Sequence, residues 1–513
     1  MFRSVLFGEF EPGADIDSRS EPECFRDLNL DQIISAVVGR KESYNLKPFF
    51  YTPLTDVDTL IYRHQIFQDL ERPEIHKLAA GFAQKELVRR FESQVRSMRR
   101  DDEGFAHHHR TRAFLNATHE YCTTVTDLAE GLTATDAQSR GLRDLRDHLD
   151  SYAASDGFIA LQADIRRLED GLDGVRYSFL IKDSTITVGA YDDETDYSAQ
   201  VTATFERFQQ GAAKNYMPDF SDWEEYVAIG VLHLVAKVYP ELFAELDDFC
   251  RRHAAYLDRT VAVFDRELQF YLSYLDYIGP LREAGLAFSY PRISTANKIE
   301  EIRETFDLAL ATQLISQAAP MVCNDIHLAG VERILVVSGP NNGGKTTLAR
   351  TFGQLHYLAR LGVPVPGRDA QLFLCDEIFT HFERQEDITT LEGKLQDELN
   401  RLHDVLGRAT SDSVLILNEM FNSTTAQDAL ALSRAILGAV SAWDALCVCV
   451  TFLDELAALN EKTVSMVSTV RTDDPAVRTY KLIRKPADGR AYAHAIAEKY
   501  GLTYDRLVGR RTG

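Results

Sequence analysis

The chain has 513 residues, of which 45% are hydrophobic and 26% are charged, a composition typical of a globular protein with two or more domains. No apolar run reaches the roughly 18 residues of a membrane-spanning helix, and the N-terminus turns acidic before a signal-peptide core can form, so we expect a cytoplasmic protein without membrane contact. The formal net charge of -22 argues against constitutive tight binding to DNA, because phosphate contacts require basic side chains.

The seven cysteines are scattered through the chain, and no two of them form a C-x-x-C pair. An odd, dispersed set argues against a disulfide framework and against a cysteine zinc site. We therefore expect these thiols to lie in the core.

The first 44 residues are polar and acidic, and they predict an irregular lead-in. A helical domain is predicted over residues 45–290, starting near Thr52–Asp56, which is typical of a turn with an N-cap before helical spacing of apolar residues. His107–His109 raises the question of a metal site. Because adjacent residues point in different directions, we interpret this run as a solvated surface turn and assign it no site.

Two further features interrupt or extend the helical pattern. Tyr177–Ile181 and Thr185–Val188 are aromatic and β-branched, which predicts a short β-hairpin or two strands inserted among the helices. Apolar residues then recur close to a three-four repeat over Pro240–Tyr277, which predicts a single helix about 55 Å long, a lever or coiled-coil arm. Gly279–Pro280 is expected to end it.

The stretch Val336–Thr347 matches G-x-x-x-x-G-K-[ST] between a β-branched strand and a helix, and it predicts a nucleoside triphosphate site. Its glycines let backbone N–H groups turn toward phosphate oxygens, and the helix N-terminus adds a positive dipole. We expect Lys345 to reach the β- and γ-phosphates and the Thr346 hydroxyl to coordinate Mg²⁺. The predicted nucleotide-binding residues are Gly339, Pro340, Asn341, Asn342, Gly343, Gly344, Lys345, Thr346 and Thr347.

A second nucleotide signal is the apolar run from Val414 to Leu417, which ends in Asn418 and Glu419. P-loop ATPases present a Mg²⁺-associated acid and a water-orienting Glu at such a strand end. Glu419 is therefore the predicted catalytic residue. Asn418 can contact Mg²⁺ through water but adds no charge, so we expect weak Mg²⁺ binding and slow hydrolysis.

Between these motifs, Asp387–Glu392 leads into a predicted helix with a leucine stripe. Thr389 and Thr390 either cap this helix or, in an ATPase that closes as a dimer, meet the γ-phosphate bound by the opposite subunit. The residues alone leave both interpretations open.

Gly339–Thr347 resembles the phosphate loop of the MutS mismatch-repair ATPases, whose form GPN-x-GGK-[ST]-[ST] is more specific than the general pattern. Asn418–Glu419 falls on the Asp-Glu pair of that family, and Thr451–Phe452 falls on its Thr-His pair. The resemblance covers about residues 45–510. Other similar segments are Thr52–Asp56 at the start of the MutS core, Val322–Ile326, Val363–Pro366, and Ile378–Thr380 with Thr389–Thr390 in the signature region.

The chain also departs from the MutS pattern. We expect no mismatch-reading domain with a Phe-x-Glu wedge, since there is no room for it before the core-like segment at Phe50, and no nuclease-type tail. The resemblance thus implies a shortened homologue. Asn418 and Phe452 replace an Asp and a His, which argues against rapid hydrolysis and ordinary sensing of the γ-phosphate.

The predicted architecture is multidomain: an all-α lever and core domain with a small β insertion over residues 45–290, then an α/β P-loop ATPase domain of the ABC type over residues 291–513. The resemblance implies a homodimer in which ATP binding and hydrolysis move lever helices and engage mismatched or structured DNA. Two alternatives stay open. One is a nucleotide-gated scaffold for a protein partner without DNA binding, and the other is a small-molecule kinase, which would explain neither the lever nor the signature helix.

Overall fold

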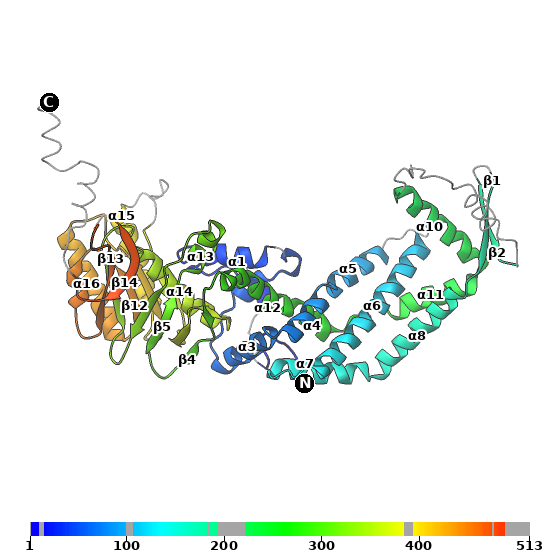
Figure 1. The fold of residues 1–513 in the computed structure, drawn as a ribbon, viewed down its shortest axis with the longest axis horizontal. Helices are drawn as coiled ribbons and strands as arrows, with labels where there is room; N and C mark the ends of the chain where they lie inside the picture. The colour runs from blue at the N-terminus through cyan, green and yellow to red at the C-terminus, as the bar shows by residue number, and fades with distance from the viewer. Residues whose placement is uncertain are drawn as a thin grey trace, which may run out of the picture. The chain divides into compact units, whose positions relative to one another are not determined.

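The computed structural model describes residues 2–9, 15–39, 41–98, 106–182, 185–192, 221–383, 393–474 and 477–487 (Figure 1). The chain folds into two compact units. Unit 1 comprises Met1–Phe2, Pro73–Gln138 and Leu142–Asp265, and unit 2 comprises Arg3–Arg72, Ser139–Gly141 and Arg266–Gly513. The chain is multidomain, with many helices and mixed sheets, while the domain boundaries at residues 44 and 290 stay a prediction.

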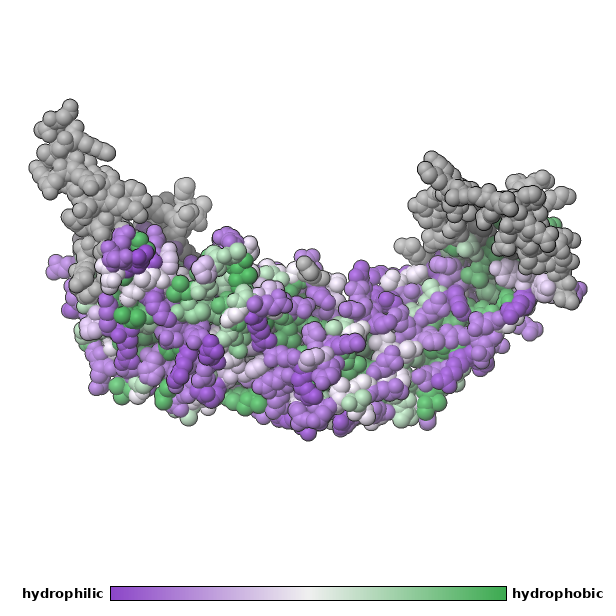
Figure 2. Space-filling view, in the orientation of Figure 1, coloured by the Kyte–Doolittle hydropathy of each residue, from purple (hydrophilic) through white to green (hydrophobic). Residues whose placement is uncertain are grey.

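Unit 1 is mainly helical. Its helices are α4 (Pro73–Ala83), α5 (Leu87–Met98), α6 (His107–Ala134), most of α7 (Arg140–Ala153), α8 (Asp156–Asp173), α10 (Ser221–Val238), α11 (Pro240–Arg252) and the start of α12 (Arg259–Glu283). Helices α6, α8 and α11 lie side by side (Figure 1) and bury Phe114, Leu161 and Phe249 between them. The face of unit 1 seen in Figure 2 is mostly hydrophilic. Among the described residues, no helix combines the length and apolar character needed to cross a bilayer.

The predicted hairpin is confirmed. Strands β1 (Tyr177–Lys182) and β2 (Thr185–Ala190) pair antiparallel, with Tyr177 opposite Ala190 and Lys182 opposite Thr185. Most of the acidic stretch that follows lies outside the described residues.

The single long helix predicted over Pro240–Tyr277 is wrong. The chain leaves the helix after Arg252, at the end of α11, and α12 begins at Arg259 with the Asp258 carboxylate accepting the backbone N–H groups of Thr260 and Val261. A carboxylate in this position caps a new helix and competes with continuation of the old one. The predicted end is also displaced, since α12 continues through Pro280 to Glu283.

The histidine run is not a turn. Residues 107–109 form the first turn of α6, where His107 and His108 are half-buried and His109 is exposed. The start of α6 is helical and partly buried because α11 packs against α6.

Unit 2 begins with segments that we expected to be irregular. Within residues 1–44, Leu30–Val38 forms helix α1, and its apolar face is buried. The remaining short elements are η1 (Ile16–Ser18), η2 (Glu42–Tyr44) and α2 (Lys47–Phe50). Helix α3 (Val57–Leu70) starts as predicted, since the Asp56 carboxylate accepts the Thr59 backbone N–H at 2.8 Å.

The rest of unit 2 is an α/β assembly. A six-stranded sheet has the order β10-β11-β12-β7-β13-β14, parallel except for β14, and a four-stranded sheet has the order β4-β9-β5-β6. The strands are β3 (Phe288–Ser289), β4 (Arg292–Ser294), β5 (Glu300–Thr305), β6 (Asn324–Leu328), β7 (Ile334–Ser338), β8 (Val365–Pro366), β9 (Asp369–Phe373), β10 (Ile378–His381), β11 (Val414–Asn418), β12 (Leu446–Val450), β13 (Thr463–Val470) and β14 (Arg478–Arg484).

Helices cover the six-stranded sheet. They are α14 (Lys345–Arg360), which packs on β11 and β12, α15 (Lys394–Arg408), α16 (Ala426–Trp443) and the short η3 (Asp454–Ala458), while α13 (Leu308–Ser316) precedes β6. Strands β7, β11 and β12 are buried along their whole length, as expected of central parallel strands. The loops that follow these three strands therefore meet at one edge of the sheet.

Six of the seven cysteines are buried and Cys323 is partly buried, and all seven are free thiols. The prediction that they belong to the core is thus confirmed for all but Cys323.

Candidate nucleotide site

The predicted phosphate loop joins β7 to α14. Gly339 and Gly344 have φ values of +117° and +89°, in the region that favours glycine, and Gly344 directly precedes the first residue of α14. Asn342 also has a positive φ of +56°. The backbone therefore adopts the turn that a Gly-rich anion cradle requires, at the N-terminus of a 16-residue helix.

Strand β13 holds the loop from the side. The Ser468 hydroxyl donates to the Gly343 carbonyl at 2.6 Å, and a Cβ added at Gly343 would lie 2.2 Å from that hydroxyl oxygen. A Cβ at Gly339 would lie 3.0 Å from the Ser468 carbonyl. Close packing thus favours glycine at both positions, and at Gly339 the positive φ adds a requirement for dihedral freedom.

Lys345 folds back over the loop. Its Nζ donates to the carbonyls of Gly339 at 3.0 Å and Pro340 at 3.1 Å, and the side chain is buried. Burial lowers the pKa of Lys345, and the nearby Glu419 carboxylate opposes that shift. The ammonium group therefore lies at the loop, where a triphosphate would be an anionic partner.

The end of β11 brings two oxygen-bearing side chains, Asn418 and Glu419, to Thr346 at the start of α14. The Thr346 hydroxyl donates to the Asn418 amide oxygen at 3.0 Å, and Glu419 follows in the turn after β11, with its backbone N–H donating to the Val450 carbonyl at 2.9 Å. Hydroxyl, amide and carboxylate oxygens are the ligand types that Mg²⁺ prefers. The residues present thus fit a Mg²⁺–nucleotide site, with a single carboxylate in the set.

Glu419 occupies an unusual backbone conformation, with φ of +55°. The Asn422 side-chain amide donates to its carboxylate at 3.3 Å. A strained conformation retained at a strand end is consistent with a functional requirement on the direction of the side chain.

Phe452 lies over the lysine. The Lys345 Nζ is 4.4 Å from the centroid of the Phe452 ring, a cation–π distance, and the phenylalanine is 48% exposed. The resemblance to the MutS motif identifies Phe452 as a replacement for histidine. The contact of its ring with Lys345 follows only from the tertiary structure.

Glu398 on α15 contacts both the end of β10 and the turn after β11. Its carboxylate accepts the Phe421 backbone N–H at 2.6 Å and lies 3.1 Å from His381 Nε2. Burial alone would raise the pKa of Glu398, but these hydrogen bonds lower it overall. This pair fixes the turn that carries Glu419, and sequence reasoning missed it.

A cavity of about 300 Å³ opens beside the phosphate loop. Gly344 and Thr347 form one wall, and Phe306, Met321 and Tyr480 contribute apolar surface. Its lining consists of Thr305, Phe306, Asp307, Leu310, Leu314, Pro320, Met321, Val322, Asn324, Gly344, Thr347, Leu348, Thr351 and Tyr480. Such a mostly apolar cavity beside an anion cradle suits the base and sugar of a nucleotide.

The structure brings together most of the predicted site. Gly339, Lys345, Thr346, Asn418 and Glu419 converge at the carboxyl ends of β7 and β11, while Thr389 and Thr390 lie outside the described residues. Ser468, Glu398, His381 and the apolar cavity residues Phe306, Met321 and Tyr480 were missed as site residues. No local pattern distinguishes a serine on a strand or an acid on a helix as a support for a loop.

Comparison with known proteins supports the same part of the chain. Residues 335–508 match the family model of MutS domain V. The chain is 26% identical over 298 residues to the DNA mismatch repair protein MutS of Halothermothrix orenii, covering 56% of this chain and 31% of that protein. It is 27% identical over 281 residues to the Chloroflexus aurantiacus (strain J-10-fl) protein of the same name, covering 52% of this chain and 27% of that protein.

A third relative is the Endonuclease MutS2 of Gemmatimonas aurantiaca, 30% identical over 201 residues, with coverage of 39% of this chain and 24% of that protein. The chain thus spans less than a third of the length of each of these three curated relatives.

Proposed function

We propose that this MutS-like chain, whose residues 335–508 match MutS domain V, binds ATP with Mg²⁺ and slowly hydrolyses the ATP to ADP and phosphate. The observation that carries this proposal is the hydrogen bond from Thr346 to Asn418, with Glu419 next in the chain, beside an intact phosphate loop. These groups come from β11 and from the start of α14, 72 residues apart.

The loop residues bind the triphosphate. Backbone N–H groups of residues 339–347 and the N-terminus of α14 attract the phosphate oxygens, and Lys345 exchanges its bonds to the Gly339 and Pro340 carbonyls for bonds to phosphate. The cavity lined by Phe306 and Tyr480 accepts the base.

The oxygen groups complete the chemistry. The Thr346 hydroxyl and, through water, the Asn418 amide would hold Mg²⁺, which when bound neutralises developing phosphate charge. Glu419 orients the attacking water and accepts its proton. Asn418 contributes no negative charge, and this is the physical reason for slow turnover.

We further propose that two copies associate through their ATPase parts when ATP is bound. Support comes from the resemblance of Thr389 and Thr390 to the MutS signature region, which would place these hydroxyls at the γ-phosphate of the opposite subunit. We also propose that the output is engagement of mismatched or structured DNA in the cytoplasm. Support comes from two of the similar proteins, which are named as DNA mismatch repair proteins.

To test both proposals, the molecular mass in solution is measured with and without ATP and Mg²⁺ for wild type and three variants. The rate of phosphate release from ATP is measured for the same proteins. Wild type is expected to shift toward a dimer with ATP, Glu419→Ala to accumulate as a dimer without releasing phosphate, and Lys345→Ala to stay monomeric. Lys77→Ala removes the same charge from an exposed position on α4 and should behave as wild type. If Glu419→Ala releases phosphate at the wild-type rate, the assigned mechanism is wrong, and if it binds ATP without dimerising, the dimer proposal fails.

A further inference from the structure

Two helices of unit 1 bring nitrogen and carboxylate groups together away from the nucleotide site. His107 and His108 are the first two residues of α6, and Asp247 lies on α11. His107 Nε2 is 2.9 Å from Asp247 Oδ1. One ligand atom from each of the three residues lies within 4.8 Å of the other two, and all three side chains are partly buried.

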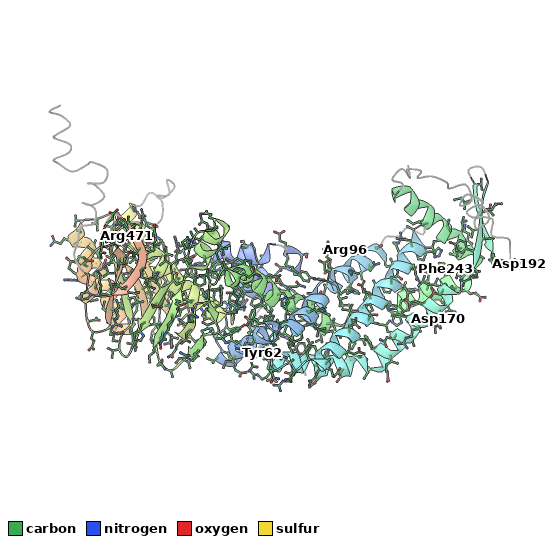
Figure 3. All side chains as sticks on the ribbon, viewed as in Figure 1. Tyr62, Arg96, Asp170, Asp192, Phe243 and Arg471 are labelled. Carbon is green, nitrogen blue, oxygen red and sulfur yellow. The ribbon has the colours of Figure 1, made fainter. Side chains whose placement is uncertain are left out.

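His108 occupies an aromatic enclosure. The centroid of its ring lies 5.1 Å from that of the His107 ring and 5.0 Å from that of the Phe243 ring. Phe243 is labelled in Figure 3. The His233 ring on α10 lies 5.8 Å away. The buried His108 Nδ1 has no hydrogen-bond partner among the described residues. A buried imidazole nitrogen without a hydrogen-bond partner destabilises the fold unless another group, such as a metal ion, binds to it.

The electrostatics of the cluster also suit a ligand. The Asp247 carboxylate provides negative charge beside the two imidazoles. Imidazole nitrogen and carboxylate oxygen are both ligand atoms of Zn²⁺.

We propose that His107, His108 and Asp247 bind one first-row transition-metal ion of the Zn²⁺ type. Two imidazoles and one carboxylate from two helices form a donor set that zinc, cobalt and nickel prefer over magnesium or calcium. A tetrahedral ion would have one further position, taken by water. The ion links the first turn of α6 to α11, two helices that already pack together.

This arrangement explains why two adjacent histidines serve one site. Both lie in the first turn of α6, at the helix end next to α11, so their side chains converge on Asp247. His109, one residue further, is exposed and does not belong to the cluster.

The test uses the full-length chain, stripped of metal and free of nucleotide, titrated with Zn²⁺ against a chromophoric chelator and separately with Co²⁺. One ion per chain is expected, with a visible tetrahedral Co²⁺ spectrum. His107→Ala and Asp247→Asn should each weaken Zn²⁺ binding by about tenfold or more.

Two histidine variants serve as matched controls. His109→Ala removes the exposed neighbour. His119→Ala removes a histidine further along α6, which pairs with Glu169 of α8 at 2.6 Å. Both should bind Zn²⁺ as wild type does. Circular dichroism establishes that each variant is folded. Equal weakening by His107→Ala and His109→Ala, or wild-type affinity in folded Asp247→Asn, would overturn the proposal.

Discussion

At the scale of single residues, the site is defined by where charge is present and where it is missing. Lys345 is buried at the loop, while the position that contacts Thr346 carries the neutral amide of Asn418. The amide preserves the hydrogen bond, so the geometry is intact. What it does not provide is the Coulomb attraction that a carboxylate offers to a divalent cation.

Asn418→Asp is therefore expected to strengthen Mg²⁺ binding and to raise the rate of ATP hydrolysis, each by about tenfold, since a charge-assisted contact adds on the order of 1–2 kcal/mol. Mg²⁺ titration of steady-state phosphate release measures both. Asn400→Asp, which places the same charge on the exposed face of α15, controls for the change in net charge. An unchanged rate and Mg²⁺ dependence in Asn418→Asp would refute the assignment.

His64 makes unit 2 sensitive to acid. Burial lowers its pKa from 6.5 to about 4, and Arg63 adds to the shift. Between these values the unfolded chain binds a proton that the folded chain does not, so stability rises with pH across this window and is lost as pH falls from 6.5 toward 4. From pH 7.5 to pH 5 the loss from this residue is about 2 kcal/mol.

His64→Leu should remove this part of the acid sensitivity. The free energy of unfolding in urea is measured at pH 7.5 and at pH 5 for His64→Leu, for wild type and for the exposed control His109→Leu. The loss of stability between the two pH values should be smaller in His64→Leu than in the other two proteins. If His64→Leu loses as much stability between the two pH values as wild type does, His64 is not the group responsible.

At the scale of elements, a strand distant in sequence fixes the phosphate loop. Local pattern predicts the order β7, loop and α14, and buried β-branched runs predict central strands such as β11. The close approach of β13 to Gly343 depends on strand order in the sheet, which periodicity does not encode.

Gly343→Ala tests this packing. The added Cβ would lie 2.2 Å from Ser468 Oγ and 2.9 Å from the Pro340 carbonyl oxygen, so the loop or β13 must shift. We expect at least a tenfold loss of affinity for a fluorescent ATP analogue. Gly438→Ala on α16 meets nothing within 4 Å and should leave affinity unchanged while stabilising the helix by about 0.5–1 kcal/mol. Wild-type ATP affinity in Gly343→Ala would show that the contact is dispensable.

At the scale of the whole molecule, the formal net charge of -22 limits how DNA can be bound. The described structure holds many of its basic side chains in ion pairs, such as Arg252 with Asp164 and Arg484 with Glu332. Any DNA contact must therefore use a local set of basic groups against a repulsive background.

Binding to a mismatched duplex should accordingly be weak and strongly dependent on salt. With about four phosphate contacts, affinity should fall by about a hundredfold between 50 and 200 mM salt, which fluorescence anisotropy with ATP and Mg²⁺ can measure. A perfectly paired duplex of the same length is the control for structure preference. Absence of binding at the lowest salt concentration, or affinity that is independent of salt, would count against DNA as the partner.

Much of the nucleotide site and part of the fold followed from the sequence. The phosphate loop, the Asp56 N-cap and the β1–β2 hairpin are local features, in which neighbouring residues determine the backbone conformation. Two predictions failed for different reasons. Leu30–Val38 forms a helix whose apolar face is buried, and this depends on packing. The predicted lever divides because the Asp258 carboxylate caps a second helix, which is a local signal that the apolar repeat outweighed in the prediction.

The sequence by itself therefore determined the chemistry available: glycines for a cradle, Lys345 and Thr346 at a helix start, and Asn418 with Glu419 at a strand end. Tertiary structure alone decided which distant groups meet, namely Ser468 with Gly343, Phe452 with Lys345, and His107 with Asp247. The reason is physical, since spacing along a chain sets local conformation, whereas contact between distant segments depends on how helices and strands pack.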